Sequence, residues 1–524
     1  MRADRWNMFG SILALSFLLA AVVLTASPYA PVVEPVMEIE AVWAIEDART
    51  ESDGPLVTYL ENGGAPLGYD AEENTFYCTL GLNQGEGWPE IHLTAPGAKG
   101  ARLVFVDDYS YDWCADAIRE GYAYQILCYT DTEFSYTQIV FTGLPIVLMQ
   151  TETAQIGYED TAAQVALSTY EGASAVGARV HLRGAGSRFS EKKSYKIDFV
   201  HGQSGAYAQA PGLGLTDDVI LLAGVMDESL IRDRLSWAVY AMMADESESY
   251  GPRDTQYVEL FVNDRYAGAY LMMEPVDDGE ELQKRGADAP MRSSVYRTAQ
   301  IDYAGERAYV PNAMREGSIY ELYHAPDTAN PFAALEDYLA LERMPQGAQH
   351  DEAFRRLAES CVDVESMMRY YLLVQAGGMS DNVFNNMYIV AQQEKGSARC
   401  SFAPWDMDLT WGRFKDAETG EIYNGLFSFP VAERMLHTDA GGARGILAAL
   451  WTRMREEIFN QENMQAMVDG IVAELTDSGA YVRDALRWRG DAYQADGSEI
   501  LQFAAMRFEA LDREFAAYGQ ADGT

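Results

Sequence analysis

Basic residues are scarce in this sequence, because 39 lysines and arginines stand against 80 aspartates and glutamates, for a formal net charge of -41. A surface this acidic repels a polyanion, so the composition excludes nucleic acid as a partner for most of the surface. Cysteine is also rare. The five cysteines match no zinc-binding spacing; they are Cys78, Cys114, Cys128, Cys361 and Cys400. Outside the cytoplasm two of the first three could pair, and the odd total leaves at least one thiol free or paired between chains.

The chain begins with one long apolar run, residues 8–26, which no charge interrupts. A run of this length can span a bilayer as a helix. Arg2 and Arg5 precede it and acidic residues follow it, which favours a retained anchor with the rest of the chain outside the cytoplasm. We therefore expect a membrane-anchored, extracytoplasmic protein, with a signal anchor in 1–30 and an acidic stalk in 31–54. A cleaved signal peptide, which would make the protein secreted, is the alternative.

Residues 55–143 contain short β-rich runs separated by Gly, Pro, Asn and Asp clusters. Short strands at regular spacing predict a small β-sandwich. The segment carries no catalytic constellation, so a spacing or adhesive role is expected. A new unit begins near residue 144 and extends to 524.

The strongest chemical signal lies between Ser380 and Gly412. Asp381 and Asn386 lie five positions apart at the start of one expected strand, and Asp406 and Asp408 end a second. Residues i and i+2 of an extended segment share a face, so in a hairpin three carboxylates and an amide would converge. Oxygen ligands of this kind favour Mg²⁺ or Mn²⁺, which share their coordination shell with phosphate.

Protein kinases space their catalytic Asp and a metal-binding Asn as Asp-x-x-x-x-Asn, the spacing of Asp381 and Asn386. The standard kinase signature is nevertheless absent, because no His-Arg precedes Asp381 and no Asp-Phe-Gly follows it. The alternative reading is that these residues only cap a turn and end two strands in solvent.

A basic segment in 180–199 has the order strand, glycine-containing turn, strand. Backbone amides in such a turn can bind anions, and a lysine on the following strand can contact a phosphate. The residues concerned are Arg183, Ser187, Lys192, Lys193 and Lys196. A plain hairpin with a basic solvent face is the alternative.

Residues 257–276 form the clearest hairpin, with Asn263-Asp264 at its turn. The chain leaves the sheet at Pro275, after Glu274, where an adenine could hydrogen-bond to the backbone. An amphipathic helix is expected from Asp227 to Met243. Further helices are expected at 331–343, 351–359, 363–377, 444–459, 462–477 and 498–518. The layout predicts an α+β fold with a sheet-rich lobe and a helical lobe, preceded by the transmembrane anchor and the β-sandwich.

These segments resemble the CotH kinase family, secreted or surface-exposed atypical protein kinases named after a bacterial spore-coat protein. The matching motifs come in the family's order over roughly 145–520. They are 183–187, 192–197, 221–233, 257–274, 381–388 and 404–412. Residues 55–143 are similar to the cadherin-like β-sandwich often found beside such domains.

The resemblance implies ATP- and divalent-metal-dependent phosphorylation of Ser or Thr in secreted or surface proteins. It makes Asp381 the catalytic Asp and Asn386 and Asp406 the metal ligands, with Asp408 in support. Lys193 or Lys196 resembles the nucleotide lysine, and Lys192 is not excluded. Arg183, Ser187 and Glu274 complete the expected nucleotide-binding set.

The chain departs from the family pattern at a few positions. Gly224 stands where Asn is usual, Asp233 where Asn is usual, and Asp264 where Gly is usual, and Ala185-Gly186 replaces Asn-Ser. No acidic or basic group named above is lost, although the phosphate-covering turn is altered.

Two other functions stay open. A pseudokinase would use the fold to display a protein-binding face, a reading supported by the scarcity of extracellular ATP. A glycosidase would need two carboxylates about 5 or 6.5–9.5 Å apart in an aromatic-lined cleft. The kinase reading expects the lysine-bearing strand to face the acidic hairpin across a metal-bound triphosphate.

Overall fold

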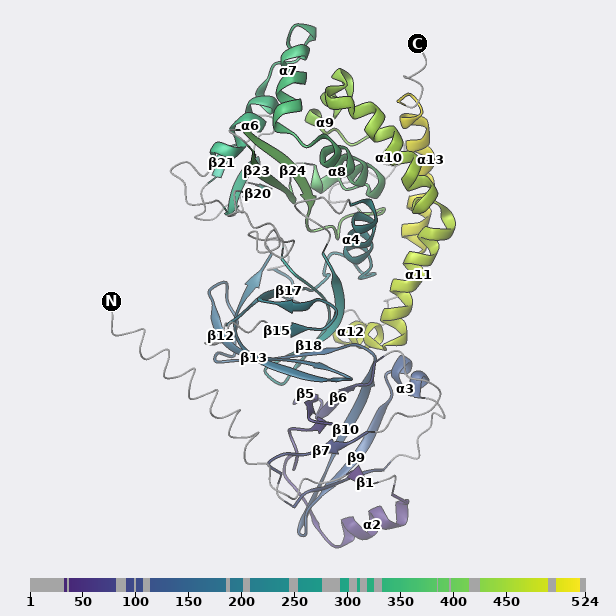
Figure 1. Ribbon diagram of the computed structural model, residues 1–524. Helices are drawn as coiled ribbons and strands as arrows, with labels where there is room; N and C mark the ends of the chain where they lie inside the picture. Colours follow the sequence, from purple (N-terminus) through teal and green to yellow (C-terminus); the bar gives the residue numbers. More distant parts are fainter. Residues whose placement is uncertain are drawn as a thin grey trace, which may run out of the picture. The chain divides into compact units, whose positions relative to one another are not determined.

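The computed structural model divides the chain into two compact units (Figure 1). The first, here the barrel unit, comprises Met1–Val225, Thr255–Glu274 and Ala473–Ala495, and the second, here the helical unit, comprises Met226–Asp254, Pro275–Val472 and Asp496–Thr524. The structure describes residues 33–34, 37–81, 91–98, 100–106, 114–184, 189–200, 208–244, 253–275, 293–300, 309–311, 318–324, 332–383, 385–394, 397–413, 425–488 and 496–518.

The first part of the barrel unit is a mixed sheet with the strand order β1-β8-β9-β10-β6-β5, in which β2 also pairs with β10. Its strands are β1 (Val33–Glu34), β2 (Thr50–Glu51), β5 (Gly68–Asp70), β6 (Thr75–Thr79), β8 (Arg102–Phe105), β9 (Ala123–Tyr129) and β10 (Glu133–Thr142). A small sheet follows the order β4-β3-β7, from β3 (Glu61–Asn62), β4 (Ala65–Pro66) and β7 (Leu93–Thr94). Two helices, α2 (Ile39–Asp47) and α3 (Cys114–Glu120), accompany them.

The sequence predicted a small β-sandwich here but not the pairing of its strands. The long strand β10 pairs in parallel with both β2 and β6, and β1 pairs in parallel with β8. Parallel partners must be brought together by connections that are long in sequence. Short-range strand and turn signals carry no information about such pairings, so the sequence could not predict them.

The second part of the barrel unit is a closed barrel with the order β11-β12-β13-β14-β17-β19-β18. Its strands are β11 (Ile146–Thr151), β12 (Thr161–Thr169), β13 (Gly172–Arg183), β14 (Ser194–Phe199), β17 (Asp218–Leu222), β18 (Thr255–Val262) and β19 (Tyr266–Met273). Two short strands, β15 (Ala208–Ala210) and β16 (Gly214–Thr216), form a separate pair. Parallel pairing of β11 with β18 closes the barrel, and inward residues such as Val165, Val180 and Ile197 fill its core.

The β18–β19 hairpin confirms the expected turn. Asn263 and Asp264 have φ of 50° and 57°, the left-handed conformation that a two-residue hairpin turn requires and that Asn and Asp tolerate best. The Asp264 that departs from the family's usual Gly thus still fits the turn.

Helix α12 (Ala480–Trp488) packs on β19, although the two are more than 200 residues apart in the sequence. Two buried ion pairs fix it there. Arg483 Nε lies 2.7 Å from Glu259 Oε1, and Lys192 Nζ lies 2.6 Å from Asp484 Oδ1. Gly268 is required at the contact, because its φ is 106° and a Cβ would lie 2.4 Å from Asp484 Oδ1.

The helical unit contains a sheet of order β21-β22-β20-β23-β24. Its strands are β20 (Ser293–Gln300), β21 (Tyr309–Pro311), β22 (Ser318–His324), β23 (Met387–Glu394) and β24 (Ser397–Pro404). The helices of this part of the chain are α4 (Arg232–Met243), η3 (Ala333–Leu335), α6 (Glu336–Arg343), α7 (Ala348–Cys361), α8 (Val364–Gly377), η4 (Ser380–Asn382), α9 (Pro430–Thr438), η5 (Ala440–Gly442), α10 (Ala443–Glu457), α11 (Gln461–Asp477) and α13 (Ser498–Phe515).

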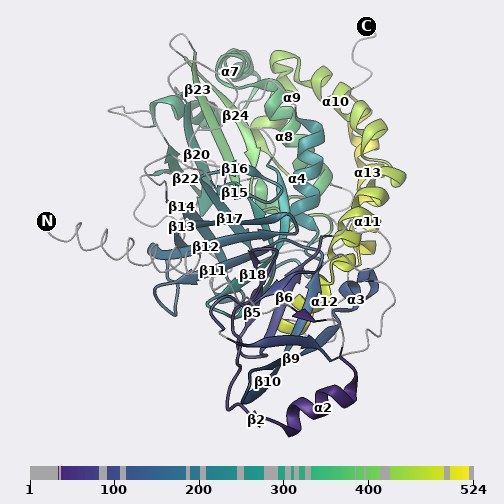
Figure 2. The same cartoon turned by 60° about the horizontal axis from the view of Figure 1, so that its bottom comes forward.

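Helix α8 organises the helical unit, because it packs on both β24 and α4 (Figures 1 and 2). Its ends follow from the sequence. The Asp363 carboxylate accepts a hydrogen bond from the Ser366 amide at the N-terminus, and Gly378 ends the helix in the left-handed conformation with φ of 66°. Buried residues around the whole of α8 make it the centre of the core.

The predicted transmembrane anchor, and with it the membrane-anchored localisation, is not supported by the structure. Among the residues that the structure describes, no helix has the length and apolarity needed to cross a bilayer. The longer helices, such as α13, bury an apolar face and expose charges on the other side. The apolar run 8–26 lies outside the described residues.

Among the cysteine side chains that the structure describes, none forms a disulfide, so the suggested pairing is not confirmed. Cys78, Cys128, Cys361 and Cys400 are buried free thiols. Burial raises the pKa of Cys78 to about 12, and a thiol that does not ionise near neutrality is a poor nucleophile. These cysteines therefore serve as core residues.

A buried carboxylate makes the stability of the helical unit depend on pH. Glu342 Oε1 accepts a hydrogen bond of 2.5 Å from the Tyr320 hydroxyl, and burial raises the pKa of Glu342 from 4.5 to about 7. Between these values the folded chain holds a proton that the unfolded chain releases, so stability falls as pH rises from about 4.5 to 7.

We expect Glu342→Gln to raise the free energy of unfolding at pH 8 by up to about 3 kcal/mol, because glutamine is uncharged and removes the cost of an ionised carboxylate in the core. At pH 4.5 most of that gain disappears. Urea unfolding at the two pH values measures it, with the exposed Glu336→Gln of the same helix as control. An equal gain at both pH values would contradict the assignment.

Candidate active site

The hairpin β23–β24 brings the sequence-predicted acidic residues to one end of the sheet. Met387 pairs with Pro404 at that end, so Asn386, directly before β23, lies close to Asp406, two residues after the end of β24. Both residues have left-handed backbone, with φ of 51° and 55°, which Asn and Asp adopt more readily than most residues. Asp381 lies in η4, one turn upstream.

Asp381, the expected catalytic residue, is hydrogen-bonded to Asn386, an expected metal ligand. Asn386 Nδ2 donates to Asp381 Oδ2 at 3.0 Å, and Asn385 Nδ2 donates to the same oxygen at 3.3 Å. Because the amide nitrogen of Asn386 is used by Asp381, its Oδ1 is the atom left to accept a metal.

A buried asparagine that sequence reasoning missed ties the two loops together. Asn382 is 1% exposed, and its Nδ2 donates to the Trp405 carbonyl at 2.6 Å and to the Asn386 carbonyl at 3.2 Å. The Tyr370 hydroxyl in turn donates to the Asn382 carbonyl at 2.6 Å. The loops before β23 and after β24 are thus held at fixed separation.

Helix α4 contributes a second set of contacts to the loop after β24. Asp233 Oδ1 accepts a hydrogen bond from the Met407 amide at 2.8 Å, and Arg232 Nε donates to the Thr410 carbonyl at 2.9 Å. Arg232 also lies 2.6 Å from Asp227. The helix was expected to begin at Asp227, but α4 begins at Arg232, and the Asp227 carboxylate accepts hydrogen bonds from the amides of Ser229 and Arg232.

These elements concentrate negative charge around Asp408. Burial raises the pKa of Asp408 well above its ordinary value, and the neighbouring carboxylates raise it further; they belong to Asp406, Asp233, Asp227 and Asp381. Like charges at such density disfavour ionisation unless a cation neutralises them. The cluster therefore has the electrostatics of a cation site.

The donor set fits magnesium or manganese. It offers carboxylate and amide oxygens, the ligands these ions prefer. Among the described His, Cys, Asp and Glu side chains, one group of three has ligand atoms within 4.8 Å of one another. That group lies on the barrel and not in the acidic cluster. Mg²⁺ completes its shell with water and phosphate, so it needs only some of its ligands from the protein.

The structure separates the three lysines predicted to bind phosphate. Lys192 is 4% exposed and contacts Asp484 Oδ1 and the Ala269 carbonyl, each at 2.6 Å. Lys196 lies on the outer face of the barrel, 2.9 Å from Asp218 and 3.2 Å from Asp198. Lys193, which lies between these two lysines in the sequence, is half-buried. Lys192 is therefore part of the network that fixes α12.

The remaining nucleotide candidates lie at the edges of elements. Arg183 is the last residue of β13, and Glu274 directly follows β19. Ser187 lies outside the described residues. The placement of a lysine-bearing strand across from the acidic hairpin stays a prediction.

A family model described as CotH kinase protein matches residues 180–511. The chain belongs to the CotH kinase family. The match begins in β13 and ends in α13, so it includes the β18–β19 hairpin, α4 and the whole acidic cluster. Membership makes the chain a kinase-like protein and confirms the resemblance. A search of curated proteins finds no match.

Proposed function

We propose that this CotH kinase family member is a protein Ser/Thr kinase that uses ATP with Mg²⁺ or Mn²⁺. The observation that supports the proposal is the gathering of Asp381, Asn386, Asp406 and Asp408 at one end of the β23–β24 hairpin. Family membership supports the same reaction class. The expected substrate is a protein that presents a serine or threonine hydroxyl.

In this proposal Asp381 is the residue that orients the acceptor hydroxyl and receives its proton. The amides of Asn385 and Asn386 hold one carboxylate oxygen of Asp381, which fixes the direction of the other. Asn386 Oδ1 and Asp406 would hold the metal ion, which supplies charge neutralisation to the phosphates when bound. Asp408 adds negative charge that strengthens cation binding.

Binding by the cluster can be measured without turnover. We expect ATP plus Mg²⁺ to raise the melting temperature of the purified chain, because a ligand that binds the folded state stabilises it by about 2.7 kcal/mol at 100 times its Kd. Asp406→Asn is expected to remove the part of the shift that needs metal, whereas the exposed Asp337→Asn keeps it. A shift of equal size in Asp406→Asn would contradict the assigned ligand.

A further inference from the structure

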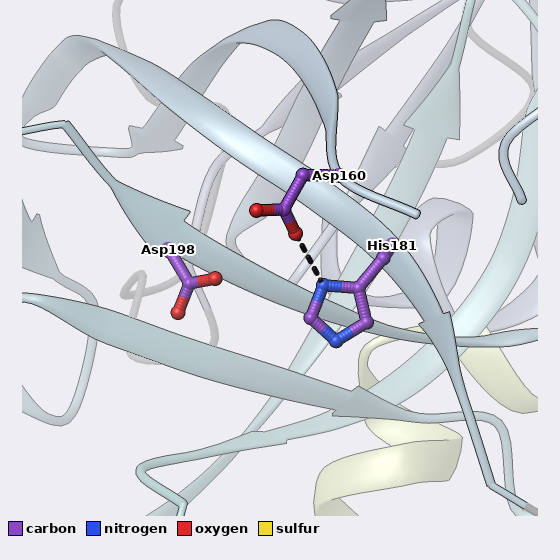
Figure 3. A group of neighbouring side chains, drawn as sticks. All are labelled: Asp160, His181 and Asp198. Atoms are coloured by element: carbon purple, nitrogen blue, oxygen red, sulfur yellow. Dashed lines mark hydrogen bonds and ion pairs between the residues drawn. The ribbon is translucent and has the colours of Figure 1, made fainter. Parts of the chain in front are cut away.

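A second group of chemically active side chains lies on the outer face of the barrel. It consists of Asp160, His181 and Asp198 (Figure 3). Asp160 directly precedes β12, His181 lies in β13, and Asp198 lies in β14. The barrel register explains the grouping, because Thr161 pairs with Val180 and therefore Asp160 lies opposite His181.

The third member comes from the next strand. His181 pairs with Lys196, so Asp198 is its diagonal neighbour, within reach of a long side chain. Strand alternation sets the direction, because Val180 and Ile197 are fully buried in the barrel core and the residues next to them point outward. In Figure 3 the Asp198 carboxylate faces the Asp160–His181 pair.

The geometry is close to that of a metal site. One ligand atom from each residue lies within 4.8 Å of the other two, and His181 Nδ1 lies 3.1 Å from Asp160 Oδ1. A tetrahedral ion with bonds of about 2.0–2.2 Å holds its ligand atoms roughly 3.3–3.6 Å apart. Small rotamer adjustments therefore suffice to close the group around an ion.

We propose that Asp160, His181 and Asp198 bind a divalent transition-metal ion of the zinc type. One imidazole nitrogen and two carboxylate oxygens form a mixed ligand set that suits Zn²⁺ and its neighbours better than Mg²⁺ or Ca²⁺. The ion would join β12, β13 and β14, and three protein ligands leave a position for water or a fourth ligand. This site lies within the barrel unit and does not depend on the proposed kinase function.

Two cations compete with the metal, and the structure shows how it can displace them. Arg179 Nη1 lies 3.6 Å from Asp160 Oδ2, the oxygen that does not face His181. Lys196 lies 3.2 Å from Asp198 and keeps its shorter contact with Asp218 when Asp198 turns to a metal. The Arg179–Asp160 pair is exposed to water, which weakens the attraction between its charges, so losing it costs little.

The test is calorimetric titration of Zn²⁺ into the metal-free full chain, with excess Mg²⁺ present to fill oxygen-only sites. We expect His181→Gln to weaken Zn²⁺ binding at least about tenfold, and Asp198→Asn to do the same. The matched control is His437→Gln, because His437 is also exposed and lies 3.6 Å from a single carboxylate, that of Asp351. That control is expected to bind as the wild type does.

Co²⁺ gives a second readout, since its visible absorption reports coordination by the protein and is expected to weaken in His181→Gln. Thermal melting of the metal-free variants shows that they are folded, as expected for outward-facing positions. Equal Zn²⁺ affinity in wild type and His181→Gln, or no Zn²⁺ uptake by the wild type, would overturn the proposal.

Discussion

Asp381→Asn is expected to lower the rate of phosphoryl transfer by about 10²–10⁴-fold, the usual contribution of a general base. The asparagine side chain can still meet the amides of Asn385 and Asn386 but cannot accept the proton of the substrate hydroxyl. Because Asp381 is not assigned to the metal, nucleotide binding is expected to change little. The effect should thus appear in kcat and not in the KM for ATP.

The measurement is the initial rate of label transfer from γ-labelled ATP at saturating Mg²⁺, with a serine-containing acceptor protein. Asp337→Asn, an exposed carboxylate on α6, is the matched control and should leave the rate unchanged. If Asp381→Asn retained full activity, the catalytic role would belong to another residue. If the wild type bound ATP and transferred nothing, the chain would be a pseudokinase.

Asp484→Ala is expected to destabilise the barrel unit by about 3–5 kcal/mol, the cost of leaving a buried charge without its partner. Lys192 and Asp484 are 3% and 0% exposed at their side chains. Without the carboxylate, the Lys192 ammonium keeps the Ala269 carbonyl and the Tyr270 ring, whose centroid lies 4.8 Å from Nζ. Neither replaces a negative charge.

A variant that lacks both charges tests the pair apart from its surroundings, and the single variants Lys192→Met and Asp484→Leu complete a double-mutant cycle. Replacing both partners, as in Lys192→Met with Asp484→Leu, is expected to recover most of the loss, because the desolvation of both charges is removed together. Urea unfolding measures each variant. The control is Arg265→Met, which breaks the exposed Arg265–Glu72 pair and is expected to cost less than about 1 kcal/mol. A double variant as unstable as Asp484→Ala would contradict the buried-pair account.

The same double variant addresses the nucleotide lysine. If Lys192 serves only to hold α12, Lys192→Met with Asp484→Leu should bind ATP and Mg²⁺ as the wild type does. If the folded double variant no longer bound ATP, Lys192 would again be a candidate for the lysine that contacts the nucleotide.

Features of the fold that depend on neighbouring residues could be predicted from the sequence. The β18–β19 turn followed from Asn263-Asp264, and α8 ended as its residues suggested, between Asp363 and Gly378. The β23–β24 hairpin followed from two apolar runs with a polar turn between them. In each case the information lies within about twenty residues, where turn chemistry and periodicity act.

Features that depend on distant residues could not be predicted. The barrel closes because β11 pairs with β18, and α12 contacts β18 through Arg483 and β19 through Asp484. The local sequence around one partner does not indicate which distant residue it will contact. The same holds for the candidate site, where Asp233 binds the Met407 amide. The sequence marked Asp233 only as a departure from the family, whereas the structure gives it a partner across the cluster.

The central claim is that the acidic cluster at the end of β23–β24 transfers phosphate with the help of a divalent metal ion. Its most direct test is label transfer from γ-labelled ATP to protein serine or threonine, measured for wild type and Asp406→Asn with and without Mg²⁺ or Mn²⁺. The account predicts transfer by the wild type only when metal is present, and none above background by Asp406→Asn. Equal transfer by the two proteins, or transfer that persists after the metal is chelated, would contradict it.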